Sequence, residues 1–182
     1  MRLFTAITLL QDVRQHLVRV QEYLAGPVWE LPGVKWTAPD NLHLTLKFLG
    51  EVDDDKLGTL TEALAAVRVQ PMALFAERIG AFPKRGRAHV ITVNPGGDAP
   101  QVAALFDQID HACEVIGLPR DRRGFTPHVT IGRSRNGVDV RRIEFQDSDL
   151  FPGPVFIASQ FQLLKSTLTP KGLIYEAIET YI

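Results

Sequence analysis

The sequence is poor in cysteine and contains no long hydrophobic run. Its 182 residues include one cysteine, Cys113, so neither an intramolecular disulfide nor a cysteine-based zinc site can form. No stretch reaches the roughly 18 consecutive apolar residues that a membrane-spanning helix needs. A disulfide-stapled secreted scaffold, a cysteine zinc module and an integral membrane protein are thereby excluded, and we expect a cytoplasmic protein with no membrane partner.

The chain also lacks an excess of charge of either sign. Its 20 Lys and Arg residues against 21 Asp and Glu residues give a formal charge of -1. Such a molecule is not a polyelectrolyte that coats nucleic acid, so any binding of anions must be local. Apolar residues make up 45% and charged residues 23%, which is too apolar for a disordered chain. We expect one globular domain over residues 1–182, without a separable linker.

Hydrophobic periodicity predicts a mixture of strands and helices. Apolar residues recur at helical spacing in three segments, residues 13–24, 57–67 and 102–116. The acidic run at 53–55 and the pair Asp98 and Pro100 are typical helix starts. Segments rich in β-branched and aromatic residues predict strands at 3–9, 34–37, 42–49, 72–82, 88–93, 128–134, 142–146, 155–164 and 173–181. Several of these strands adjoin as hairpins, so the pattern indicates an α+β fold.

One short pattern occurs twice, each time in a segment that reads as a strand. A histidine, an apolar residue, a threonine and another apolar residue begin at His43 and again at His128. Because side chains at i and i+2 share a face of a strand, His43 and Thr45 line one face, and His128 and Thr130 do the same on the second strand. Two half-domains related by a pseudo-twofold axis would bring the two motifs face to face.

These residue types suit a phosphoryl displacement. One histidine can accept a proton from the nucleophile while the other gives a proton to the departing oxygen. Threonine hydroxyls can donate hydrogen bonds to the non-bridging oxygens. A single His-x-Thr on a strand is usually an accident of β-propensity, but two copies in matching context point to a shared site.

The two motifs sit within longer runs that extend over the whole chain. These runs are Met1-Arg-Leu-Phe4, Leu42-His-Leu-Thr-Leu-Lys-Phe-Leu-Gly50, Gly80-Ala-Phe-Pro83, Phe125-Thr-Pro-His-Val-Thr-Ile-Gly-Arg133, Ser166-Thr-Leu-Thr-Pro170 and Tyr175-Glu176. In them the sequence resembles the 2′-5′ RNA ligase-like RNA 2′,3′-cyclic phosphodiesterases of the two-histidine phosphoesterase superfamily.

The resemblance implies a bilobal fold in which two pseudo-symmetric lobes, each with an antiparallel sheet, line a central cleft with helices outside. It implies hydrolysis of RNA 2′,3′-cyclic phosphate termini, those of tRNA fragments included, to 2′-phosphomonoesters by a monomer without metal or cofactor, and reversible 2′-5′ ligation. His128 would be the general base that activates water, His43 the general acid for the leaving 3′ oxygen, and Thr45 and Thr130 the phosphate ligands. The sequence alone leaves the acid and base roles exchangeable.

Arginines cluster around the second motif. Strict alternation sends Arg133 to the apolar side of its strand, but Gly132 allows a bulge that turns it toward the cleft and the phosphate. Residues 120–135 contain five arginines against one acidic residue, and a patch of this kind can follow an RNA backbone. We therefore count Arg122 and Arg123 as candidate RNA contacts; an ordinary solvated loop is the alternative.

Aromatic and lysine side chains near the motifs are further candidates. Phe82 and Phe125 are flanked by turn residues and are candidates for stacking on RNA bases. Phe48 is expected in the core because it alternates with Lys47. Lys47 shares the face of His43, where it either neutralises phosphate or lies at the periphery.

Other functions remain open on the sequence. The same site could take a small cyclic nucleotide or an ADP-ribose cyclic phosphate, or the chain could be a non-catalytic RNA-binding module. Metal-dependent hydrolysis is disfavoured because each motif lacks an adjacent carboxylate, whereas a catalytic metal normally has about three protein ligands.

Overall fold

The structure is a computed structural model and describes residues 1–182 except 28, 30, 32, 123, 144–148 and 171. The described residues form three α-helices, α1 (Gln11–Ala25), α2 (Leu57–Ala65) and α3 (Ala99–Val115), besides short 3₁₀ turns. The strands are β1 (Arg2–Thr8), β2 (Val34–Trp36), β3 (His43–Glu51), β4 (Met72–Phe82), β5 (Arg87–Gly97), β6 (Val129–Asp139), β7 (Phe156–Ala158), β8 (Phe161–Thr169) and β9 (Gly172–Tyr181). Within the described part of the chain, no helix has the length and hydropathy to span a bilayer.

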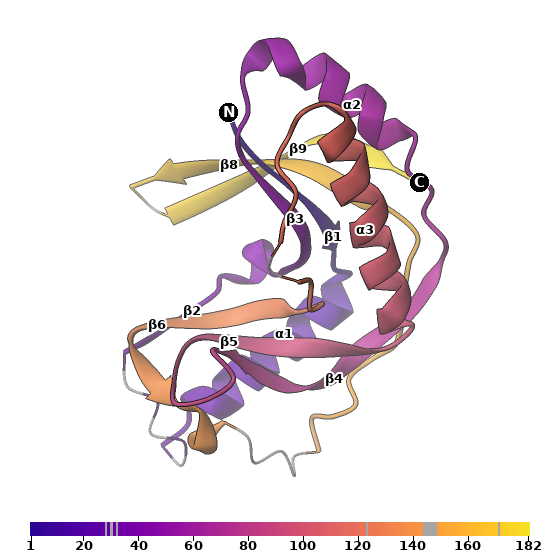
Figure 1. The fold of residues 1–182 in the computed structure, drawn as a ribbon. Helices are drawn as coiled ribbons and strands as arrows, with labels where there is room; N and C mark the ends of the chain where they lie inside the picture. Colours follow the sequence, from indigo (N-terminus) through magenta and orange to yellow (C-terminus); the bar gives the residue numbers. More distant parts are fainter. Residues whose placement is uncertain (28, 30, 32, 123, 144–148, 171) are drawn as a thin grey trace.

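The nine strands of the described residues belong to one antiparallel sheet. Its order is β7-β4-β5-β6-β3-β1-β8-β9, with β2 paired to β6. In Figure 1 the sheet bends so that β4, β5 and β6 form a lower layer and β1, β3, β8 and β9 an upper one. The fold is thus the predicted α+β arrangement, and its two halves join where β3 meets β6.

The two halves are built from corresponding units. A strand, a helix and a later strand occur in the order β1, α1 and β3, with the short β2 between α1 and β3, and again as β5, α3 and β6. The helices cross between halves, because α1 contacts β6 while α3 contacts β3. This exchange intertwines the halves around a shared core.

The amphipathic pattern of α1 explains its placement. Val13, Leu17, Val20 and Leu24 recur at helical spacing, and all four are almost completely buried. Gly26 follows the last turn. The predicted stripe therefore corresponds to the face that α1 buries.

The expectations for two segments need correction. The predicted strand 142–146 lies mostly outside the described residues, and its first residue belongs to a short 3₁₀ turn, Val140–Arg142. The predicted strand 155–164 is two strands, because β7 pairs with β4 in one half and β8 pairs with β1 in the other. One straight strand cannot serve both halves, so the chain breaks between Ala158 and Phe161.

Candidate active site

The two His-x-Thr motifs meet at the centre of the sheet. Leu44 of β3 lies opposite Val129 of β6 in an antiparallel pair. Carrying this register one residue each way places His43 beside Thr130, and Thr45 beside His128. Leu44 and Val129 are buried toward α1, so the four polar side chains share the opposite face, which we call the histidine face.

Both imidazoles are held by the same backbone contact. Nδ1 of His43 lies 2.8 Å from the carbonyl oxygen of Asn41, and Nδ1 of His128 lies 2.7 Å from that of Thr126. A carbonyl oxygen can only accept, so each Nδ1 carries the hydrogen. Each neutral ring therefore keeps the lone pair of Nε2 for proton transfer.

The site favours neutral imidazoles. Burial lowers the pKa of His43 and the hydrogen bond to Asn41 opposes this, while the positive charges of His128 and Arg133 lower the pKa further. Burial also lowers the pKa of His128, and the positive charge of Arg133 lowers it further, while the hydrogen bond to Thr126 opposes both effects. The two histidines thus lie close enough to act on one another, and an anion between them would raise both pKa values.

Aromatic rings orient each histidine. Phe4 lies 5.0 Å and Tyr175 5.2 Å from the ring of His43, measured between centroids. Phe82 lies 4.9 Å from the ring of His128. No local pattern in the sequence marks Phe4 or Tyr175 as a neighbour of His43; both occur only within the runs that resemble the two-histidine phosphoesterases. Phe82, expected to stack on RNA, lies beside a catalytic candidate.

Arg133 reaches the histidine face through a bulge. Gly132 lies opposite Ile91 and Thr130 opposite Thr92, so β6 carries one extra residue at this point. The extra residue reverses the alternation, as Gly132 allowed. The charge of Arg133 acts on His43, His128 and Tyr175, whose side chains line this face.

A bulge in β3 overturns the expectations for Lys47 and Phe48. Ala6 lies opposite Thr45, but Thr5 lies opposite Lys47, so β3 also has one extra residue. Lys47 is consequently buried on the covered face, where its Nζ lies 2.6 Å from Oδ1 of Asp110. Phe48 is not in the core but is 61% exposed on the histidine face, next to Phe4.

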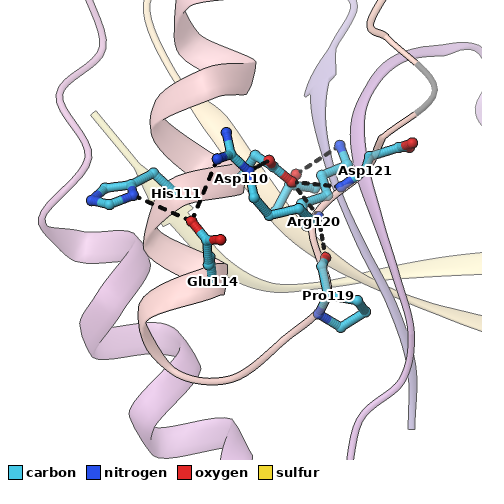
Figure 2. A network of polar contacts seen from close by, with 8 residues as sticks. Asp110, His111, Glu114, Pro119, Arg120 and Asp121 are labelled. Carbon is cyan, nitrogen blue, oxygen red and sulfur yellow. Dashed lines mark hydrogen bonds and ion pairs between the residues drawn. The ribbon is translucent and has the colours of Figure 1, made fainter.

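The arginines of residues 120–135 lie in different environments. Arg120 pairs with Asp110 and Glu114, as Figure 2 shows, whereas Arg122 and Arg135 are exposed. Arg123 lies outside the described residues. Phe125 stacks at 4.4 Å on Phe106 of α3, so one of its faces is already covered.

A hollow of about 210 Å³ adjoins Phe82. Arg78, Lys84 and Asn94 contribute polar groups to its lining. Gly80 packs closely on this lining, because an added Cβ would lie 2.5 Å from Oδ1 of Asn94. Phe82 thus lies between His128 and a hollow to which Arg78 and Lys84 contribute positive charge.

Among the described residues, no three His, Cys, Asp or Glu side chains gather as a set of metal ligands. The groups that the site does present are two imidazoles, two hydroxyls and a guanidinium. This set can move protons and stabilise a phosphate anion.

Known proteins share the sequence and the fold. A family model described as LigT like Phosphoesterase matches residues 7–92. The chain is 32% identical to an RNA 2′,3′-cyclic phosphodiesterase of Methanocaldococcus jannaschii, over 100% of both chains, and 33% identical to one of Archaeoglobus fulgidus, over 100% of this chain and 99% of the other. The crystal structure of E. coli LigT complexed with 3′-AMP superimposes with a TM-score of 0.80 at 22% identity, covering 99% of this chain and 96% of that one.

Proposed function

The chain belongs to the LigT-like phosphoesterase family, and from this premise we propose that it hydrolyses the 2′,3′-cyclic phosphate at the 3′ end of RNA to a 2′-phosphomonoester. The observation that carries the proposal is the matched pair of imidazoles, each held through Nδ1 with Nε2 left for chemistry. Two groups so placed suit an in-line displacement, which needs a base on one side of phosphorus and an acid on the other.

In the proposed mechanism the histidines exchange protonation states. Neutral His128 accepts a proton from water as the water oxygen bonds to phosphorus. Protonated His43 gives its Nε2 proton to the 3′ oxygen as the bond from that oxygen to phosphorus breaks. The 2′ oxygen keeps the phosphate, and proton exchange with solvent restores both imidazoles.

The hydroxyls and the guanidinium would stabilise the charge that grows on the phosphate. Thr45 and Thr130 lie beside His128 and His43 respectively in the register of the strands. Their hydroxyls can donate to the two non-bridging oxygens, and Arg133 supplies a positive charge on the same face. Donors fixed on a rigid sheet stabilise a transition state without reorganising.

The direct test is product analysis. Purified protein is incubated with an oligonucleotide that ends in a 2′,3′-cyclic phosphate, in excess EDTA and without it. We expect the 2′-phosphomonoester at equal rates in both, because the proposed groups need no Lewis acid. A 3′-phosphate product, or activity lost with EDTA and restored by metal, would contradict the proposal.

RNA rather than a free nucleotide is the proposed substrate, and the cationic surroundings support this choice. Arg122 is exposed in the segment that leads to His128, and Arg78 and Lys84 line the hollow beside Phe82. Lysines and arginines that contact backbone phosphates make binding tighter for longer strands and weaker in salt. We propose a cytoplasmic monomer that acts on RNA ends such as those of tRNA fragments. We also propose reversible 2′-5′ ligation at the same site, in which the 5′ hydroxyl of a second RNA replaces water as the nucleophile, the bond from phosphorus to the 3′ oxygen breaks, and a 2′-5′ phosphodiester forms.

The effect of substrate length distinguishes RNA from a small cyclic nucleotide as the substrate. We expect KM for a cyclic-phosphate hexanucleotide to lie below that for a cyclic mononucleotide at low salt, and the difference to shrink as salt rises. Arg122→Gln should weaken binding of the hexanucleotide more than binding of the mononucleotide. Arg14→Gln, on α1, is the control. Equal KM values at low salt would instead favour a small cyclic nucleotide as the substrate.

A further inference from the structure

A buried ion pair connects the strand of the first motif to helix α3. Lys47 lies two residues beyond Thr45, and the bulge in β3 turns its side chain to the covered face. Its Nζ donates to Oδ1 of Asp110 at 2.6 Å and to the carbonyl oxygen of Pro119 at 2.8 Å. Both charged side chains are only 2% exposed, and such a pair persists only when its hydrogen bonds are well satisfied.

Asp110 also holds the loop that follows α3. Its Oδ2 accepts from Nε of Arg120 at 3.0 Å, and its Oδ1 accepts from the backbone N–H of Asp121 at 3.0 Å. Figure 2 shows Asp110 at the centre of these contacts, with Arg120 extending also to Glu114. Together with the Lys47 contact to Pro119, the pair fixes three consecutive residues of the loop.

The same loop carries the group that aims His128. Beyond the pinned residues, Phe125 stacks on Phe106 of α3, and the carbonyl oxygen of Thr126 accepts the hydrogen bond from Nδ1 of His128. His43 is aimed by a different segment, because its partner Asn41 is tied to β9 through Nδ2 and the carbonyl oxygen of Leu173. The two imidazoles therefore depend on separate supports.

We propose that Lys47 and Asp110 are positioning residues, which tie strand β3 to the loop that orients the imidazole of His128. A carboxylate is suited to this task because it accepts from an ammonium, a guanidinium and a backbone N–H at once. Two apolar side chains could fill the same space but could not fix the loop. The consequence for activity rests on the proposed function, whereas the orientation of His128 does not.

Two variants separate positioning from stability. Lys47→Met removes one charge and leaves Asp110 buried and unpaired, so it should lower both stability and turnover. The double variant Lys47→Met, Asp110→Leu replaces the pair by apolar groups, which often restores stability. We expect the melting temperature of the double variant to lie near that of the wild type. Its kcat should still be reduced on the order of 10-fold to 100-fold, because small displacements of catalytic groups have effects of this size. KM should change far less than kcat.

NMR of the imidazole nitrogens reports the hydrogen bonding and orientation of His128 without requiring catalytic turnover. In protein labelled with ¹⁵N at histidine, we expect the double variant to lose part of the Nδ1–H tautomer of His128 and to leave His43 unchanged. Arg120→Met, which removes the contact of Asp110 with a half-exposed guanidinium, should fold and show a smaller change of the same kind. The exposed pair of Asp139 and Arg141 supplies a control, since Arg141→Met should alter neither spectrum.

The outcomes are distinct. Wild-type turnover and an unchanged His128 spectrum in a stably folded double variant would overturn the positioning role. If the wild type hydrolyses no cyclic phosphate, the proposed function fails, and the spectra still decide whether Lys47 and Asp110 orient His128. If the double variant does not fold, the same spectral comparison is made on Arg120→Met, and an unchanged His128 there would count against the proposal.

Discussion

Leu44 and Val129 face one another where β3 meets β6, and this pair sets which side chains of the two motifs lie together. Both side chains are buried, so their neighbours on each strand turn to the opposite face. Each histidine then lies beside the threonine of the other motif. The site is thereby shared between the two halves, and neither half alone holds both imidazoles and both hydroxyls.

Removing either imidazole should abolish most of the turnover. We expect His43→Ala and His128→Ala each to lower kcat by about 10²-fold or more, because general acid-base groups contribute about 10² to 10⁴. Thr45→Ala and Thr130→Ala should lower kcat less, since each substitution removes one hydrogen-bond donor among several. Single-turnover rates on a cyclic-phosphate oligonucleotide measure these losses, with circular dichroism to verify folding. A variant with an unchanged rate would remove that residue from the proposed mechanism.

Local patterns in the sequence predict the elements and the polar faces of the two motifs. The spacing of Val13, Leu17 and Val20 is enough to predict α1, because amphipathic spacing is a property of a single segment. The faces of His43 and Thr45 follow in the same way from alternation along one strand.

The positions that depend on partners distant in sequence could not be predicted. Lys47 and Phe48 exchange faces because β3 carries a bulge where it pairs with β1, and Lys47 then meets Asp110, which lies 63 positions further along the chain. Tyr175 joins His43 only because β9 folds back beside β8 at the edge of the sheet. No periodicity within a segment records such contacts.

The bulge that turns Arg133 should not tolerate a side chain at Gly132. An added Cβ would lie 2.9 Å from Cε3 of Trp36 and 3.0 Å from Cγ1 of Val34, so β2 would have to move. We expect Gly132→Ala to lower the free energy of unfolding by about 1–3 kcal/mol, the usual effect of overpacking. Urea denaturation measures the change.

Gly58 offers the matched control. It lies in α2 with no atom within 4 Å of an added Cβ, so Gly58→Ala should raise the free energy of unfolding by about 0.4–1 kcal/mol through the unfolded state. Equal effects of the two substitutions would contradict the close packing at Gly132.

Arg133 should set the pH dependence of the free enzyme. A nearby cation disfavours imidazolium, so Arg133→Gln should raise the pKa of both histidines. Since kcat/KM reports the pKa values of the free enzyme, both limbs of its bell should move to higher pH. Because the two histidines interact, the limbs belong to the pair rather than to single residues.

Arg135→Gln is the control for this experiment. Arg135 is exposed on the same strand, and within the described structure its charge contributes to neither shift. The limbs should therefore stay in place. A shift of equal size in both variants would mean that the overall charge, rather than the position of Arg133, governs the histidines.

Binding of the product should draw protons from solution. The pKa values of His43 and His128 lie below the ordinary value, near 6.5, so at pH 7 both imidazoles are largely neutral in the free enzyme. A 2′-phosphate between them stabilises imidazolium and raises both pKa values. Titration calorimetry with adenosine 2′-monophosphate, repeated at pH 7 in buffers of different ionisation enthalpy, should therefore give a net proton uptake. The double variant His43→Ala, His128→Ala corrects for protons that the phosphate itself binds, and the uptake should fall in that variant. An equal uptake in both proteins would show that the imidazoles stay neutral beside the product, which the proposed acid and base roles do not allow.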